Sequence, residues 1–157
     1  MTTMLQNVVV LVARVLLSQI FIAAAINHIL SWGGTIKYMT AQGMAMEGIL
    51  GGAGKVAVHV FLILAVAFLL LGGLSILAGF RARVGAVLLI GFLIPATLIF
   101  HHFWTYDSAG MDYQMQMMNF MKNTAMMGGI LMILAYGAGG FSVDARLLRR
   151  RKARTEN

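Results

Sequence analysis

Two consecutive histidines, His101 and His102, lie between aromatic residues at the point where an apolar stretch of the sequence ends. An imidazole titrates close to neutral pH, so it can exchange a proton with a quinol oxygen or ligate a metal ion or haem. Two further histidines, His28 and His59, also stand at the edges of apolar stretches, and Lys122 lies near the start of another. What these side chains can do depends on whether the fold brings them together.

The composition identifies the solvent in which they must work. The chain has 157 residues, of which 60% are hydrophobic and 11% are charged, and its mean hydropathy is +0.84. Such a chain has too few polar side chains to cover a water-soluble globule, so we expect it to lie in a lipid bilayer. Because it contains no cysteine, disulfides, thiolate metal sites and cysteine-held iron–sulfur clusters are excluded.

Four stretches are long and apolar enough to cross a bilayer, which takes about 20 residues per helix. They predict an all-α membrane protein, a four-transmembrane-helix bundle with spans at about 8–30, 56–77, 84–103 and 117–136. The first loop contains Ile36, Tyr38, Met39, Met44 and Met46 between glycine pairs, which is typical of a short interfacial helix. We therefore expect one domain over residues 1–144 and a basic tail over residues 145–157.

The distribution of basic residues predicts the orientation. Of the 12 Lys and Arg residues, six lie between Arg146 and Arg154, on the same side of the predicted bundle as Arg81 and Arg83. The positive-inside rule then makes both termini cytoplasmic. A basic tail next to a span is explained by its attraction to anionic lipid headgroups. Four spans leave too little chain for a nucleic-acid recognition fold, so nucleic acid is not an expected partner. All four histidines come to the outer face.

This placement predicts a shared outer-face cavity with His101, His28, His59, Lys122 and Asn123 as ligand-binding residues. On a continuous helix His101 and His102 would point about 100° apart, and we expect His101 to face inward. The ammonium of Lys122 repels a metal cation and favours an anionic oxygen. The spans contain no carboxylate to complete an acid and base pair, so no catalytic residue is assigned. The alternative is that His residues at helix ends are ordinary interfacial anchors.

Methionines support a second interpretation of the same face. Thioethers beside imidazoles are the ligand set of Cu(I), which makes a copper site from His101, His102, Met115 and Met118 an alternative. Methionine also fills irregular gaps in apolar bundles, and Met127 and Met132 recur deeper in the same predicted helix.

Four residues are predicted to have structural roles. Arg14, within the first span, is expected to anchor neighbouring helices by hydrogen bonds or to snorkel to the interface. Pro95 is expected to kink the third span. The pair Gly72 and Gly73 is expected to let a neighbouring helix approach closely.

Several of these motifs together resemble the DoxX family of small bacterial membrane proteins. They are Arg14 with Asn27-His28, the Gly72-Gly73 helix, the run Gly79 to Arg83, the segment Phe92 to His101, and Asn119 to Asn123 with Gly128-Gly129. The resemblance implies a four-helix bundle in the bacterial inner membrane, similar to subunits of quinone-linked oxidoreductases such as thiosulfate:quinone oxidoreductase. It carries over His101, Lys122 and Asn123 as motif positions.

Three hypotheses follow from the residues and the resemblance. The first is a non-catalytic membrane subunit of a quinone-dependent redox complex, or a homo-oligomer, whose outer cavity takes a quinone or a small anion. The second is a protein that handles copper or another metal on its periplasmic face. The third is a structural assembly subunit without a site of its own.

Overall fold

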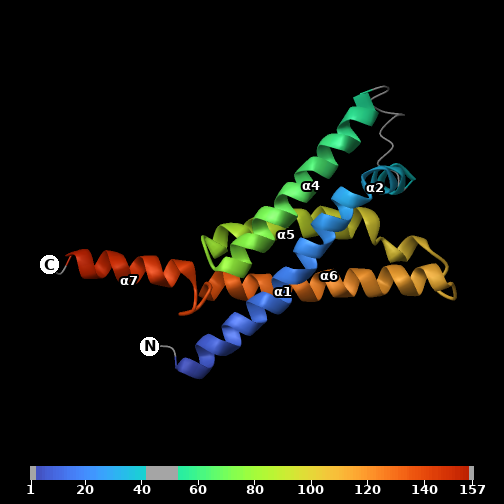
Figure 1. Ribbon diagram of the computed structural model, residues 1–157. Helices are drawn as coiled ribbons and strands as arrows, with labels where there is room; N and C mark the ends of the chain where they lie inside the picture. Colours follow the sequence, from blue (N-terminus) through green and yellow to red (C-terminus); the bar gives the residue numbers. More distant parts are fainter. Residues whose placement is uncertain (1–2, 42–52, 156–157) are drawn as a thin grey trace.

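The computed structural model describes residues 3–41 and 53–155, and all regular secondary structure in these ranges is helical (Figure 1). The predicted loop residues Met44 and Met46 lie outside the described residues, as do both chain ends. The elements are α1 (Met4–Leu30), α2 (Trp32–Met39), α4 (Ala53–Ala78), α5 (Ala82–Phe100), the 3-10 helix η2 (Phe103–Thr105), α6 (Met111–Tyr136) and α7 (Val143–Thr155).

Three helices are long and apolar enough to cross a membrane: Met4–Leu30, Gly54–Ala78 and Ala82–Thr105. They correspond to the first three predicted spans. Helix α6 has 26 residues, but polar side chains such as Asn119, Lys122 and Asn123 lower the hydropathy of its first half. It is therefore absent from the spans found in the described residues, and its crossing of the membrane stays a prediction. The short helix expected in the first loop is present as α2.

The long helices pack in chain order, with α4 against α1 and α5, and α6 against α5 (Figure 1). Successive long helices run in opposite directions, so the two ends of the described chain lie on the same side of the bundle. Helix α2 lies at the opposite end. Many large hydrophobic side chains remain exposed on the outside of the helices, as lipid contact requires.

The packing follows a spacing of three and four residues along each helix. In α1 the buried residues are Arg14, Ser18, Phe21 and Ala25, which a helix places on one face. The central core joins these to the buried faces of the other long helices and includes Leu69, Leu89, Leu93 and Ile130. A smaller cluster of Met39, Val58 and Leu62 packs beneath α2.

The paired glycines serve two different neighbours of α4. A Cβ on Gly72 would lie 2.6 Å from Leu89 Cγ of α5, whereas one on Gly73 would lie 3.0 Å from Ile22 Cγ1 of α1. Gly85 of α5 meets the same contact from the other side, since its Cβ would lie 3.0 Å from the Gly72 carbonyl oxygen. The close approach predicted for this pair is thus present on both faces of α4.

Arg14 is the interhelical anchor at the end opposite α2. Its guanidinium is buried and donates hydrogen bonds to four backbone carbonyls from two distant segments: Ile76, Leu77, Ala138 and Phe141. Each carbonyl accepts from a charged donor, and such a hydrogen bond is stronger than one from a neutral donor. The side chain therefore joins the end of α4 to the turn that follows α6, and it does not snorkel outward.

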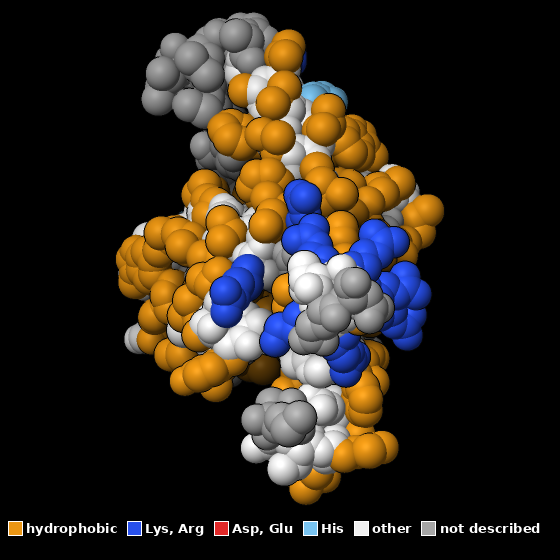
Figure 2. Space-filling view, turned by 90° about the vertical axis from the view of Figure 1, so that its left-hand side faces the viewer, with side chains coloured by type: hydrophobic (Ala, Val, Ile, Leu, Met, Phe, Trp, Pro, Cys, Tyr) orange, Lys and Arg blue, Asp and Glu red, His pale blue; other side chains and the backbone are white. Residues whose placement is uncertain are grey.

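Asp144 holds the next turn at the same end. Its carboxylate accepts hydrogen bonds from the backbone N–H groups of Arg81 (2.9 Å) and Ala82 (3.3 Å), where α5 begins. Arg81 has the left-handed φ of 47°, which is uncommon outside glycine and is supported here by this contact. The anchored turn carries α7, whose basic side chains gather amid a largely hydrophobic surface on this side of the molecule (Figure 2).

Candidate functional site

A cavity of about 320 Å³ lies among α1, α2, α4, α5 and α6, toward the α2 end. Most of its lining is apolar and comes from the inner faces of the helices. Its polar lining residues are His28, Thr35, Tyr38, His101, Lys122 and Asn123. Four of the five predicted ligand-binding residues, all except His59, therefore border one space.

His101 is positioned by the end of α5. The helix ends at Phe100 and not at 103 as the sequence pattern suggested, because the last helical hydrogen bond runs from the His101 N–H to the Thr97 carbonyl (3.1 Å). The ring Nδ1 lies 2.8 Å from Gln116 Oε1 of α6. An amide oxygen only accepts, so in this contact Nδ1 is the donor, and Nε2 is the ring nitrogen that remains for another partner.

Asn123 and Lys122 come from the same turn of α6. The Asn123 amide is buried and donates from Nδ2 to Thr97 Oγ1 at 3.0 Å, which ties α6 to α5 directly below His101. Lys122 is exposed, although it borders the cavity, and its Nζ donates to Asn119 Oδ1 at 2.9 Å. A cation at the rim of a largely apolar space favours an acceptor oxygen inside it.

The opposite wall comes from the end of α1 and from α2. His28 Nδ1 lies 3.4 Å from the Thr35 hydroxyl, whose own proton goes to the Ser31 carbonyl (3.0 Å). Tyr38 stacks on Phe100 with a centroid distance of 5.9 Å. The short helix α2 thus covers the cavity between α1 and the end of α5.

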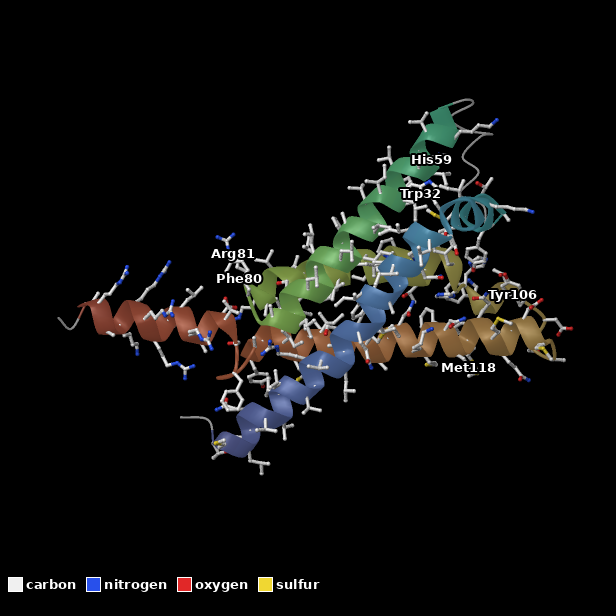
Figure 3. The ribbon with its side chains drawn as sticks, viewed as in Figure 1. Trp32, His59, Phe80, Arg81, Tyr106 and Met118 are labelled. Atoms are coloured by element: carbon white, nitrogen blue, oxygen red, sulfur yellow. The ribbon has the colours of Figure 1, made fainter. Side chains whose placement is uncertain are left out.

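His59 is the predicted site residue that the structure leaves outside this cavity. It follows Val58, which is on the buried face of α4, so its side chain points about 100° away from that face. Its Nδ1 lies 2.9 Å from the Lys55 carbonyl, and its ring lies near Trp32 at the α2 end (Figure 3). The sequence places His59 near the start of α4, whereas the direction of its side chain around the helix axis is set by the packing of Val58 into the core.

The four residues of the copper alternative have different surroundings, and of them only His101 is among the described residues that line the cavity. His102 Nδ1 lies 2.8 Å from the Ile99 carbonyl, and its ring is 5.9 Å from that of Tyr106. Met115 and Met118 are exposed on α6, and Met118 projects from its outer side (Figure 3). Among residues 3–41 and 53–155, no three His, Cys, Asp or Glu side chains are grouped so that they could hold a metal ion.

Because α5 ends at Phe100, the two histidines are separated by a turn and not by a helical step. His101 is the C-cap residue of α5, with a φ of −124°, and His102 is the N-cap residue of η2. The aromatic side chains of η2 then pack on α6, where Phe103 lies 5.6 Å from Tyr113 and 5.4 Å from Phe120 between ring centroids. This packing fixes the turn that points His101 inward.

Gln116 and Thr97 are site residues that the sequence interpretation missed. Both are buried, and each holds a predicted residue in place. A signal was available in α6, because Gln116, Asn123 and Ile130 follow one another at intervals of seven residues. Such a spacing places all three on one helix face, as in the structure.

The cavity suits a small ring with acceptor oxygens. It presents imidazole, ammonium and amide groups at one end and hydrocarbon elsewhere, which is the usual composition of a small-molecule site. A quinone headgroup has this combination of a flat apolar ring and carbonyl oxygens, so the residues present fit it. No Asp or Glu is among the described residues that line the cavity.

Comparison with known proteins places the chain in a family. The DoxX family model matches residues 9–102, which include most of α1, all of α4 and α5, and His101. Inner membrane protein YqjF of Escherichia coli (strain K12) is 34% identical over 147 residues, covering 94% of this chain and 97% of that protein. Inner membrane protein YphA of the same organism is 30% identical over 139 residues, covering 88% of this chain and 90% of that protein.

No solved structure matches the chain. The alignments with these two relatives extend beyond the family-model match and cover most of α6, where Lys122 and Asn123 lie. Both are inner membrane proteins, in agreement with the three membrane-spanning candidates found in this structure. The chain is therefore a member of the DoxX family and a protein of the inner membrane.

Proposed function

We propose that this protein is an accessory membrane subunit of a quinone-linked redox system and that its cavity binds the quinone headgroup. The observation that carries the proposal is the convergence of His28, His101, Lys122 and Asn123 on one largely apolar cavity. His101 and Lys122 would hold the headgroup: Nε2 of the His101 ring would accept a hydrogen bond from a hydroxyl of the quinol, and the Lys122 ammonium would attract a carbonyl oxygen of the quinone. A bound quinone supplies the electron transfer; the residues of this chain orient it.

The proposed topology has four spans, with α6 as the fourth. Its second half is apolar, and Ile130 and Ile133 belong to the same core as α1, α4 and α5. Its polar first half borders the cavity, where polar side chains are needed to bind the headgroup. With Arg81, Arg83 and α7 on one side, the positive-inside rule puts that side in the cytoplasm and the cavity toward the periplasm.

The role of a subunit is the one that the DoxX resemblance implies. The cavity lining presents two imidazoles and the Lys122 ammonium, which can hold and orient a ring with acceptor oxygens. We propose that a partner protein in the membrane complex supplies the electrons.

Quinone binding by the purified protein in lipid nanodiscs tests the proposal. We expect decylubiquinone to quench the fluorescence of Trp32 and Trp104 in a saturable way. His101→Gln removes the ring that borders the cavity, and we expect it to weaken binding about tenfold, equivalent to one strong hydrogen bond. His59→Gln is the matched control, because His59 lies outside the cavity, and it should bind as the natural protein does.

Two outcomes would contradict the proposal. Equal effects of His101→Gln and His59→Gln would show that the cavity is not the binding site. Stoichiometric copper in the protein purified without chelators, together with no saturable quenching, would replace the quinone by the metal alternative.

A further inference from the structure

A second hollow lies on the outer surface between α4 and α5, with a volume of about 470 Å³. All of its described lining residues are apolar, and Pro95 is among them. We call this hollow the α4–α5 groove. Its outer positions Phe61, Leu64 and Ile99 are exposed, so in the membrane the groove faces the lipid tails.

The groove and the polar cavity share a wall. Met39, Ala65, Phe92, Ala96 and Phe100 border both spaces. Ala65 of α4 and Ala96 of α5 contribute only a methyl group each to this wall. The site therefore has a polar compartment on the inside and a hydrocarbon compartment on the lipid side, separated in part by very small side chains.

From this thin shared wall we propose that the ligand is a tailed quinone, which enters from the bilayer between α4 and α5. Its ring occupies the polar cavity, and its apolar tail passes Ala65 and Ala96 into the α4–α5 groove. This inference rests on the proposed function and adds the ligand class and the entry route. In this proposal the groove binds the tail, whereas the headgroup site by itself would need no groove.

The mostly apolar lining of the cavity favours this occupant over a phospholipid headgroup. Every phospholipid carries a phosphate anion, which is costly to bury among hydrocarbon side chains even with Lys122 at the rim. A quinone ring is uncharged and brings acceptor oxygens. A tail bound in the groove also removes apolar surface from contact with mobile lipid and restrains the ring in the cavity.

Filling the groove without touching the cavity tests the proposal. Gly91 lines the groove only, and a Cβ there would meet Phe68 at 3.7 Å, an ordinary contact. Gly91→Leu therefore places a side chain in the groove. Gly128→Leu is the matched control, because a Cβ at Gly128 meets nothing within 4 Å and that residue borders neither space.

Two probes separate the compartments in the same nanodiscs: decylubiquinone and the ubiquinone headgroup without a side chain. We expect Gly91→Leu to weaken decylubiquinone binding by about tenfold, since displacing about two methylene groups costs that much. It should leave the affinity for the tailless headgroup unchanged. Gly128→Leu should leave both affinities unchanged, and His101→Gln should weaken both.

The proposal is overturned if Gly91→Leu binds decylubiquinone as the natural protein does, which would mean that ordinary lipid fills the groove. It is also overturned, with the proposed function intact, if the natural protein binds both probes equally well. If the natural protein binds neither probe, the proposed function fails as well. Leu64→Phe, on the α4 wall of the groove, provides the same test should Gly91→Leu fail to fold, and it leaves the tryptophan fluorescence readout unchanged.

Discussion

Arg14 shows how this bundle uses a charge inside an apolar environment. Its guanidinium is buried and is stabilised by hydrogen bonds to backbone carbonyl oxygens. Arginine suits this task because its planar group presents several donors in a fixed geometry. The same two parts of the chain are also joined where α7 begins, since the Asp144 N–H donates to the Gly79 carbonyl at 3.0 Å. Arg14 adds four hydrogen bonds from one side chain to this junction.

We expect Arg14→Met to destabilise the protein by about 2–5 kcal/mol, because several charge-assisted hydrogen bonds at about 1.5–3 kcal/mol each are lost while the cost of burying the charge is relieved. Thermal unfolding in detergent measures the effect. Arg149→Met is the control, since Arg149 is exposed and has one hydrogen bond, to the Gly140 carbonyl. Equal melting temperatures for the two variants would show that the Arg14 contacts contribute little.

At the scale of helices, small residues decide how closely α4 packs. Gly72 and Gly85 bring the backbones of α4 and α5 together, while Gly73 does the same for α4 and α1. In lipid, where there is little hydrophobic drive between helices, such close packing is a main source of helix association. The geometry also determines where the cavity opens, because α4 and α5 form the wall between the cavity and the groove.

Gly72→Ala should therefore destabilise the helix pair. The added Cβ would lie 2.6 Å from Leu89 Cγ and 3.0 Å from the Gly85 carbonyl oxygen, so α5 must shift. Overpacking of this kind costs about 1–3 kcal/mol. Gly128→Ala makes the same change where the space is open, and its better helix propensity should leave stability unchanged or slightly raised. Comparable melting temperatures for both variants would argue against the close contact.

At the scale of the molecule, polarity differs between the two ends. One end has Arg81, Arg83 and the basic helix α7, while the other has α2, the histidines and the cavity (Figures 1 and 3). A membrane protein inserted with the basic end in the cytoplasm would present its cavity toward the periplasm.

Reporter fusions test this orientation and the fourth span together. A fusion after Asn157 should report the cytoplasm, and an insertion within residues 105–110 should report the periplasm. With three crossings alone, α6 would not return the chain, and both reporters would give the same compartment. The expected opposite signals require α6 to cross the membrane.

Several features could be predicted from the sequence because they depend on local properties. The helices follow from the length of the apolar stretches, and the glycine contacts from residue size. Arg14 could be recognised as an anchor, since a charge within a span must find partners. The common depth of His28, His101, Lys122 and Asn123 also followed from their places near helix ends.

The tertiary structure decided which of these side chains meet. His59 has the predicted depth but lies one residue from the buried face of α4, and that single step turns it away. His101 faces inward because α5 ends at Phe100 and Gln116 receives its ring, a contact between residues 15 apart in the sequence. Span length is a property of consecutive residues, whereas a cavity depends on the rotation of each helix about its axis, which packing against its neighbours sets.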